Sequence, residues 1–232
     1  MLLCSLPIIY LKMASSGLNN NTCKFKAIDK KYNCDILITF PEVINGKIDT
    51  KKFLDASLAT AAVLDKVNKI FTPIKYIIQN NVEKIMKKYQ ANVREYSTIQ
   101  DLILSEKNYS KKMSVTDSLI WLLRGLKMVM LFIEEIVKSS KTGEFIEDLG
   151  ANIRYSYKKS LEPYHDWMAI QLFSLLIRMA PTKSKLMLAL ANDLPNREEQ
   201  VLQAMEYFTN GLKTNLINLE FFINDNNLDV IS

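Results

Sequence analysis

The chain has 232 residues, of which 48% are hydrophobic and 24% are charged. These fractions are typical of a folded globular protein and exclude wholesale disorder, and the length suits one large domain or two small ones. The net charge of +5 suits contact with anionic membranes, or simply a soluble protein, and we expect no nucleic-acid partner. Six glycines and six prolines are too few for the turns of a β-sandwich or the glycine-rich loop of a dinucleotide-binding core.

The first 35 residues are expected to form a flexible leader (1–35) before a single domain at 36–232. The leader begins with MLLCSLPIIYLKM, an apolar run well below the roughly 20 residues that a membrane-spanning helix needs. It lacks a basic start and is broken by Pro7, which argues against a cleaved signal peptide. The three cysteines all lie near this end and lack zinc-site spacing, which favours a reducing, cytoplasmic compartment.

From about residue 50, apolar residues recur at helical spacing almost throughout. The first predicted helix carries on one face Leu54, Leu58, Ala61, Leu64 and Val67. Thr72 and Pro73 are typical of an N-cap followed by proline at the first helical position, so a second helix is expected after them. Thr98 and Asp101 have the spacing of a capping box and predict the start of a short helix.

The second half of the chain is also predicted to be helical. A long apolar helix is expected over about 116–137, followed by a loop at 139–145. Pro163 is expected to open or kink a helix that Pro181 stops. Two further helices are expected around 184–192 and 197–223. The sequence therefore predicts a single all-α domain of about seven or eight helices.

Several polar and aromatic residues lie on or beside the apolar helix faces. Asn81 and Lys84 border one apolar stripe, and the simplest interpretation is an amide that bonds buried backbone beside a lysine that reaches outward. Trp121 shares a face with Asp117 and Met128, where core packing is the default role of the indole. These residues are the candidates for a polar site beside an apolar interior.

The single histidine, His165, lies at helical spacing with Met168, and a lone histidine on an apolar face is usually a core residue. Trp167 points elsewhere and is expected to be exposed. The sequence contains no HExxH, GxSxG, phosphate-loop or CxxC motif, so we expect no enzyme, metal site or cofactor. An all-α domain with polar residues beside strongly apolar faces suits a binder of apolar ligands as well as a helical interaction module.

Five short motifs occur in order along the chain: FTPIK (71–75), NNVEKI (80–85), WLLRGLK (121–127), YHDW (164–167) and MAP (179–181). With Phe173 between the last two, this set resembles the glycolipid transfer protein family over roughly residues 50–225. The resemblance implies a two-layer helical sandwich that encloses one membrane lipid and holds the lipid headgroup at a polar surface site. We accordingly expect a monomer that carries a glycosphingolipid-like lipid and touches membranes transiently.

The resemblance also implies roles for individual residues. Asn81 and Lys84 match the family's sugar-contacting amide and lysine, and Trp121 matches its stacking platform for the first sugar ring. His165 matches the histidine that donates to the carbonyl of the lipid amide, and Trp167 matches an aromatic residue used in membrane docking. The positions that line the hydrocarbon pocket are matched by Ile74, Met128, Phe132 and Phe173.

One position departs from the family pattern. The family usually has an aspartate two residues after FTPIK that accepts hydrogen bonds from the lipid amide and the sugar, whereas this chain has Ile77. Three outcomes stay open: Asp117, one turn before Trp121, replaces the missing acid; the ligand lacks the amide donor; or the fold is kept and transfer is lost. Because the other matching residues remain, we expect lipid binding to be retained.

The headgroup also has an alternative. The family's branch that carries ceramide-1-phosphate places arginines at the positions of Trp121 and Gly125, so this sequence favours a sugar over a phosphate. Lys84 and Arg124 still offer cationic help to a phosphate. The remaining alternatives are a carrier or sensor of a non-sphingoid lipid and a helical interaction module that has lost transfer.

Overall fold

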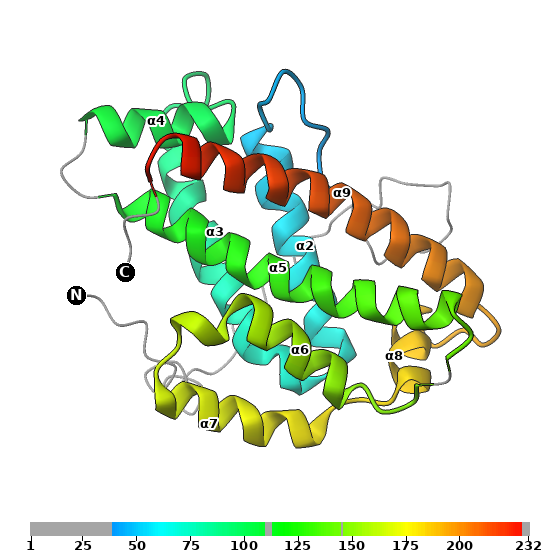
Figure 1. Cartoon of the computed structure of the whole chain (residues 1–232). Helices are drawn as coiled ribbons and strands as arrows, with labels where there is room; N and C mark the ends of the chain where they lie inside the picture. The colour runs from blue at the N-terminus through cyan, green and yellow to red at the C-terminus, as the bar shows by residue number, and fades with distance from the viewer. Residues whose placement is uncertain (1–38, 110–112, 145, 229–232) are drawn as a thin grey trace, which may run out of the picture.

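The structure is a computed structural model that describes residues 39–109, 113–144 and 146–228, so the predicted leader at 1–35 lies outside the described residues. Within these ranges the chain forms eight α-helices and no β-strand (Figure 1). The helices are α2 (Thr50–Val67), α3 (Thr72–Ala91), α4 (Ile99–Tyr109), α5 (Ser114–Lys141), α6 (Gly150–Ser160), α7 (Trp167–Leu176), α8 (Lys183–Leu190) and α9 (Glu198–Asp225). Short 3₁₀ turns precede α3 and flank α7: η1 (Lys69–Phe71), η2 (Glu162–Tyr164) and η3 (Ile177–Met179).

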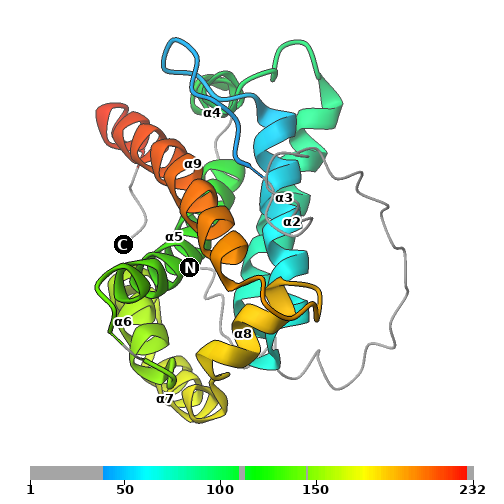
Figure 2. The ribbon, with the colours of Figure 1, turned by 90° about the vertical axis from the view of Figure 1, so that its right-hand side faces the viewer.

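Helix α5 is the centre of the fold. Buried residues occur on all sides of it, from Val115 to Ser139, and a helix that is apolar all round must be covered all round. It packs against α3, α6 and α9, and it also contacts α4. Figure 2 shows α2 and α3 together on one side of the molecule, with α5, α6 and α9 on the other. This is the predicted two-layer sandwich, and α8 closes one end by contacting α2 and α9.

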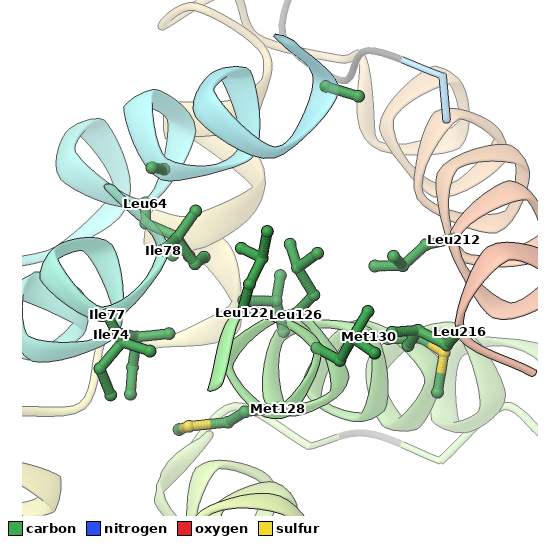
Figure 3. Close-up of a cluster of buried hydrophobic side chains, with 14 of the residues drawn as sticks. Leu64, Ile74, Ile77, Ile78, Leu122, Leu126, Met128, Met130, Leu212 and Leu216 are labelled. Carbon is green, nitrogen blue, oxygen red and sulfur yellow. The ribbon is translucent and has the colours of Figure 1, made fainter. Parts of the chain in front are cut away.

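The space between the layers is filled by apolar side chains (Figure 3). Ile78 of α3 is directed toward Leu122 and Leu126 of α5, and all three are fully buried. Leu212 and Leu216 approach the same region from α9. Each such buried side chain contributes about 1.5–3 kcal/mol to folding, so this cluster is what holds the layers together. None of the helices in the described ranges is long and apolar enough to cross a bilayer.

The predicted helix starts have mixed outcomes. Thr98 forms the expected cap, because its hydroxyl oxygen accepts from the backbone N–H of Asp101 at 3.3 Å and bonds the Asp101 carboxylate at 2.6 Å. The predicted N-cap at Thr72 is wrong. Thr72 already belongs to α3, and Phe71 occupies the cap position without a side-chain cap bond. The reason is that η1 runs directly into α3, so no separate cap is needed.

The region after α5 differs most from the prediction. α5 continues to Lys141, which shortens the loop predicted at 139–145. Pro163 lies in η2 and does not open α7. The backbone is extended at His165, and α7 begins after Asp166, whose carboxylate caps it. α6 is a helix that the sequence pattern does not predict, since GANIRYSYKKS has too few apolar residues for a clear stripe.

Candidate functional site

The candidate site residues from the first half of the chain lie along the seam where α3 packs on α5. Ile77 packs on Gly125, where an added Cβ would lie only 3.2 Å from Ile77 Cγ2. Two turns further along α3, the charge of Lys84 acts on the carboxyl of Asp117. The two pairs follow one another in opposite chain order, so the helices are antiparallel at this seam.

The register of the α3–α5 seam orders the side chains from polar to apolar. Asn81 lies one turn from Ile77 along α3, and Trp121 lies one turn from Gly125 along α5 on the same side of that contact. Ile74 and Met128 lie about one turn on the other side of it. Lys84 is exposed at one end, while Ile74 and Met128 are each 1% exposed at the other. A ligand along this seam would therefore meet charge first, then an amide and an indole, and then hydrocarbon.

Asn81 is almost buried, with 8% of its surface exposed. Its Nδ2 donates to the backbone oxygen of Ile77 at 2.7 Å, a bond within its own helix. This agrees with the simple interpretation of the sequence, an amide that satisfies buried backbone. A primary amide has a second N–H and an oxygen as well, so this bond uses only part of its capacity.

An aromatic cluster surrounds Trp121. The imidazole of His165 stacks on the indole, with ring centroids 6.0 Å apart and an angle of 17° between the planes. Tyr164 meets the same indole edge-on at 6.4 Å. The guanidinium of Arg124 lies 3.4 Å from the centroid of the Tyr164 ring and 5.0 Å from that of Trp121, in cation–π geometry. The structure thus brings together Trp121 and His165, which are 44 residues apart in the chain.

His165 is held in one protonation state. Its Nδ1 lies 2.8 Å from the hydroxyl of Tyr157. Burial lowers the pKa of His165 to about 4, against the opposing charge of Asp166 and with the aid of Arg124, so the imidazole is neutral near pH 7. Burial raises the pKa of Tyr157, so its hydroxyl stays protonated beside Nδ1. A protonated hydroxyl can donate or accept: where it donates to Nδ1, the imidazole proton is on Nε2, and where it accepts from Nδ1–H, Nε2 is an acceptor.

Asp117 lies in an environment that disfavours its charge. Burial raises the pKa of its carboxyl, the carboxylate of Glu106 adds to this, and Lys84 opposes it. Glu106 is itself buried and accepts hydrogen bonds from the backbone N–H groups of Val115 and Thr116 at 2.9 and 2.7 Å. A carboxylate there satisfies unpaired donors in the first turn of α5 and matches the helix dipole. Glu106 therefore anchors the end of α5 that carries Asp117.

The four residues matched to the hydrocarbon pocket are all buried, but they do not line one cavity. Phe132 lies beside Phe71 and lines an apolar cavity of about 30 Å³ between α2, α5, α8 and α9. Ile74 and Met128 lie at the apolar end of the α3–α5 seam, outside that lining. Phe173 stacks on Tyr157 at 3.9 Å, on the α6–α7 side. A cavity of this size holds one or two water molecules, so a lipid chain would enter only if side chains move apart.

Exposed apolar side chains gather on η2, α7 and η3. Trp167 is 73% exposed, as the sequence predicts. The other large exposed residues of this segment are Tyr164, Met168, Leu175 and Met179. Of the ten residues of α7, only Ala169 and Phe173 are buried. Such a concentration of exposed apolar surface marks a site for a membrane or another partner.

Tyr157 is the functional residue that the sequence reasoning misses. It lies on α6 four residues after Ile153 and four before Leu161, the C-cap, and this spacing is the weak signal for a helix that lacks a clear apolar stripe. Its pairing with His165 depends on the turn at η2, which no local pattern specifies. No group of three or more His, Cys, Asp or Glu side chains in the described ranges could hold a metal ion.

Comparison with known proteins gives concordant results. A family model described as "Glycolipid transfer protein (GLTP)" matches residues 48–192. Glycolipid transfer protein A of Xenopus laevis is 28% identical over 195 residues, which cover 82% of this chain and 93% of that protein. The match therefore includes nearly the whole of that relative.

Solved structures share the fold. A fungal glycolipid transfer protein, HET-C2, superposes with a TM-score of 0.69 at 25% identity, covering 82% of this chain and 92% of the other. The apo form of mouse ceramide-1-phosphate transfer protein superposes with a TM-score of 0.71, covering 84% and 94%. The identity to the mouse protein is 13%, so that likeness concerns the fold alone.

Proposed function

The chain belongs to the glycolipid transfer protein family, and from this premise we propose that it binds one membrane glycolipid and carries it between membranes. It does so from the cytoplasm and without making or breaking a covalent bond. The headgroup binds at the polar end of the α3–α5 seam, through Asn81, Lys84, Asp117, Trp121 and His165, with Ile77 below them. The hydrocarbon chains enter the apolar end.

The observation that carries this proposal is the neutral His165 imidazole beside Trp121. We assign the Tyr157 hydroxyl as the donor to Nδ1, which leaves Nε2–H for a carbonyl of the lipid. The imidazole stacks on the indole of Trp121, so a sugar ring would stack on indole surface that the imidazole does not cover. A carbonyl acceptor and a neighbouring sugar ring are the chemistry of a glycolipid at the junction of head and chains.

The apolar interior supports the same function, although it is closed. Two lipid chains resist passage through water by about 0.8 kcal/mol for each buried CH₂, so a carrier must offer them an apolar lining. Ile74 and Met128 begin that lining at the seam, and Phe132 extends it toward the cavity between the layers. Because methionine is flexible, Met128 suits a lining that must adapt to chains of different length. The chains would open this space as they enter.

Membrane contact fits the apolar surface of α7. Trp167 lies two residues from His165, so a membrane that covers the exposed indole lies next to the proposed headgroup site. The net charge of +5 adds a weak attraction to anionic lipid. We propose that a monomer docks transiently through this segment and takes up lipid there.

Transfer of a fluorescent glycolipid between phosphatidylcholine vesicles tests the function. We expect the wild-type chain to move galactosyl lipids, and Trp121→Ala and His165→Leu to abolish most of that transfer. Phe221→Ala is the matched control, because Phe221 is an exposed aromatic residue on α9 away from the seam, and its transfer rate should equal that of the wild type.

Mass spectrometry of lipids bound after incubation with total membrane lipid tests the headgroup independently. A bound glycolipid supports the proposal. A bound ceramide-1-phosphate would replace it with the phosphate-reading alternative, which Arg124 and Lys84 would then serve. The absence of any bound or transferred lipid would favour a helical interaction module.

A further inference from the structure

Along the α3–α5 seam, one position lies between the part of the site proposed for the headgroup and the part proposed for the chains. Asn81 and Trp121 lie on the headgroup side, and Ile74 and Met128 lie on the side of the chains. Between them lies the level of Ile77. In a lipid held along this seam, the group that joins the chains to the head is therefore next to Ile77.

His165 supplies a donor for that joining group. In the tautomer assigned above, with the Tyr157 hydroxyl donating to Nδ1, its Nε2–H fits a carbonyl oxygen. A carbonyl is present in the ester of a diacylglycerol lipid and in the amide of a sphingolipid. The His165 donor alone therefore does not distinguish the two lipid classes.

The α3 wall at this level offers nothing to an N–H group. The Ile77 side chain cannot accept a hydrogen bond, and it is 92% buried against Gly125 and its neighbours. The backbone oxygen of Ile77 already accepts from Asn81 Nδ2 at 2.7 Å as well as serving the helix. Ile77 packs so closely on Gly125 that a Cβ added at the glycine would lie 3.2 Å from Ile77 Cγ2, which leaves no room for a bridging water there.

Asp117 is a poor replacement for the missing acceptor. It lies one turn of α5 beyond Trp121, on the side away from Gly125 and Ile77. Burial and the carboxylate of Glu106 disfavour the charged form of its carboxyl. The acid is therefore displaced from the level of Ile77 toward the headgroup end of the seam.

Building on the proposed function, on which this assignment rests, we infer that the site selects ester-linked glycolipids, of the glycosyl diacylglycerol class, over amide-linked glycosphingolipids. An ester satisfies the donor at His165 and has no N–H to leave unpaired at Ile77. An amide in the same place buries an N–H without an acceptor, which is unfavourable. Ile77 is thus the residue that sets the linkage specificity.

Two lipids that differ only in the linkage test this selection. Monogalactosyl diacylglycerol and galactosylceramide, each with the same fluorescent acyl chain, are offered to the wild-type chain in phosphatidylcholine vesicles. We expect the ester-linked lipid to be transferred and bound at least about tenfold better, equivalent to about 1.4 kcal/mol. Equal or better transfer of galactosylceramide would overturn the selection while leaving the proposed function intact. Failure to move either lipid would overturn the proposed function itself.

Substitution of Ile77 tests the assignment to this residue. Ile77→Asp and the neutral Ile77→Asn each place an acceptor at this level, and we expect either one to raise galactosylceramide transfer relative to the ester by about tenfold. Ile217→Asp, at an exposed position on α9, is the control and should leave the ratio unchanged. A folded Ile77→Asn with an unchanged ratio would show that linkage is read elsewhere. Should Ile77→Asp unfold, Ile77→Asn and the wild-type ratio still decide.

Discussion

Helices α6 and α7 follow one another and are similar in length. They differ in that the more polar sequence, α6, packs into the fold, whereas the more apolar one, α7, is largely exposed. α6 has a polar sequence, yet it packs along α5 and buries Tyr157 completely within the site. α7 is among the most apolar segments of the chain, yet it leaves Trp167, Met168 and Leu175 in water. The contrast shows that an apolar composition indicates a tendency to be buried. It does not indicate whether the side chains pack against the protein's own core or against a partner. In α7 most side chains do not pack against this protein's own core.

The largest expected difference between the two helices is in folding stability. Tyr157→Ala should lower the free energy of unfolding by about 3–5 kcal/mol, because it removes a fully buried ring that stacks on Phe173 and opens a cavity. Leu175→Ala on α7 should change it by less than about 0.5 kcal/mol, since that side chain is exposed. Urea unfolding measures both. Similar losses would mean that α7 belongs to the folded core as much as α6 does.

The next largest effect is on membrane binding, where substitution in α7 should matter and substitution in α6 should not. Trp167→Ala should weaken binding to phosphatidylcholine vesicles by about 10–100-fold, because a large apolar side chain no longer enters the lipid. Tyr155→Ala, at an exposed aromatic position on α6, is the control and should leave vesicle binding unchanged. Co-sedimentation with vesicles gives both values. Loss of binding in the α6 variant alone would move the docking surface from α7 to α6.

The buried site beside α6 should also respond to acid. Because burial lowers the pKa of His165 to about 4 from 6.5, the unfolded chain binds a proton that the folded chain does not bind between these values. The stabilising contribution of neutral His165 is present above pH 6.5 and is lost as the pH falls toward 4. Between pH 7 and pH 5 the wild type should lose about 1–2 kcal/mol more unfolding free energy than His165→Gln. An equal loss in both proteins would mean that His165 titrates normally.

The smallest predicted effect isolates one hydrogen bond. Tyr157→Phe keeps the ring and removes only the donor to His165 Nδ1, so unfolding free energy should fall by about 1 kcal/mol. The imidazole should then populate both neutral tautomers, and ¹⁵N NMR of the ring nitrogens would show this. Tyr155→Phe should leave the spectrum unchanged. A wild-type spectrum already showing the Nδ1–H tautomer would contradict the assigned donor at Nε2.

Sequence patterns predict those parts of the molecule in which a local signal and tertiary packing agree. The apolar stripe of α5 and the cap at Thr98 are of this kind, as is the shared face of Asn81 and Lys84. α6 escapes prediction because its helicity depends on packing against α5 more than on its own apolar residues. The predicted start of α7 is misplaced. Asp166, whose side chain accepts from the backbone N–H of Ala169, starts the helix instead of Pro163.

The candidate site shows the same limit. The family resemblance identifies Trp121 and His165 in separate motifs and does not predict their contact. Their stacking requires the η2 turn and the chain reversal between α5 and α6. Tyr157 had no motif to reveal it, because its role exists only through contact with His165. The closed interior could not be foreseen either, since apolar stripes state which side chains are inside and not whether they fill the space.

The small size of the apolar cavity beside Phe132 has a consequence for a carrier after it has delivered its cargo. A permanently hollow carrier would keep a wet apolar chamber, prone to capture the wrong molecule or to stick to other proteins. The cavity between α2, α5, α8 and α9 holds only about 30 Å³. A molecule that enters there must therefore push the surrounding side chains apart.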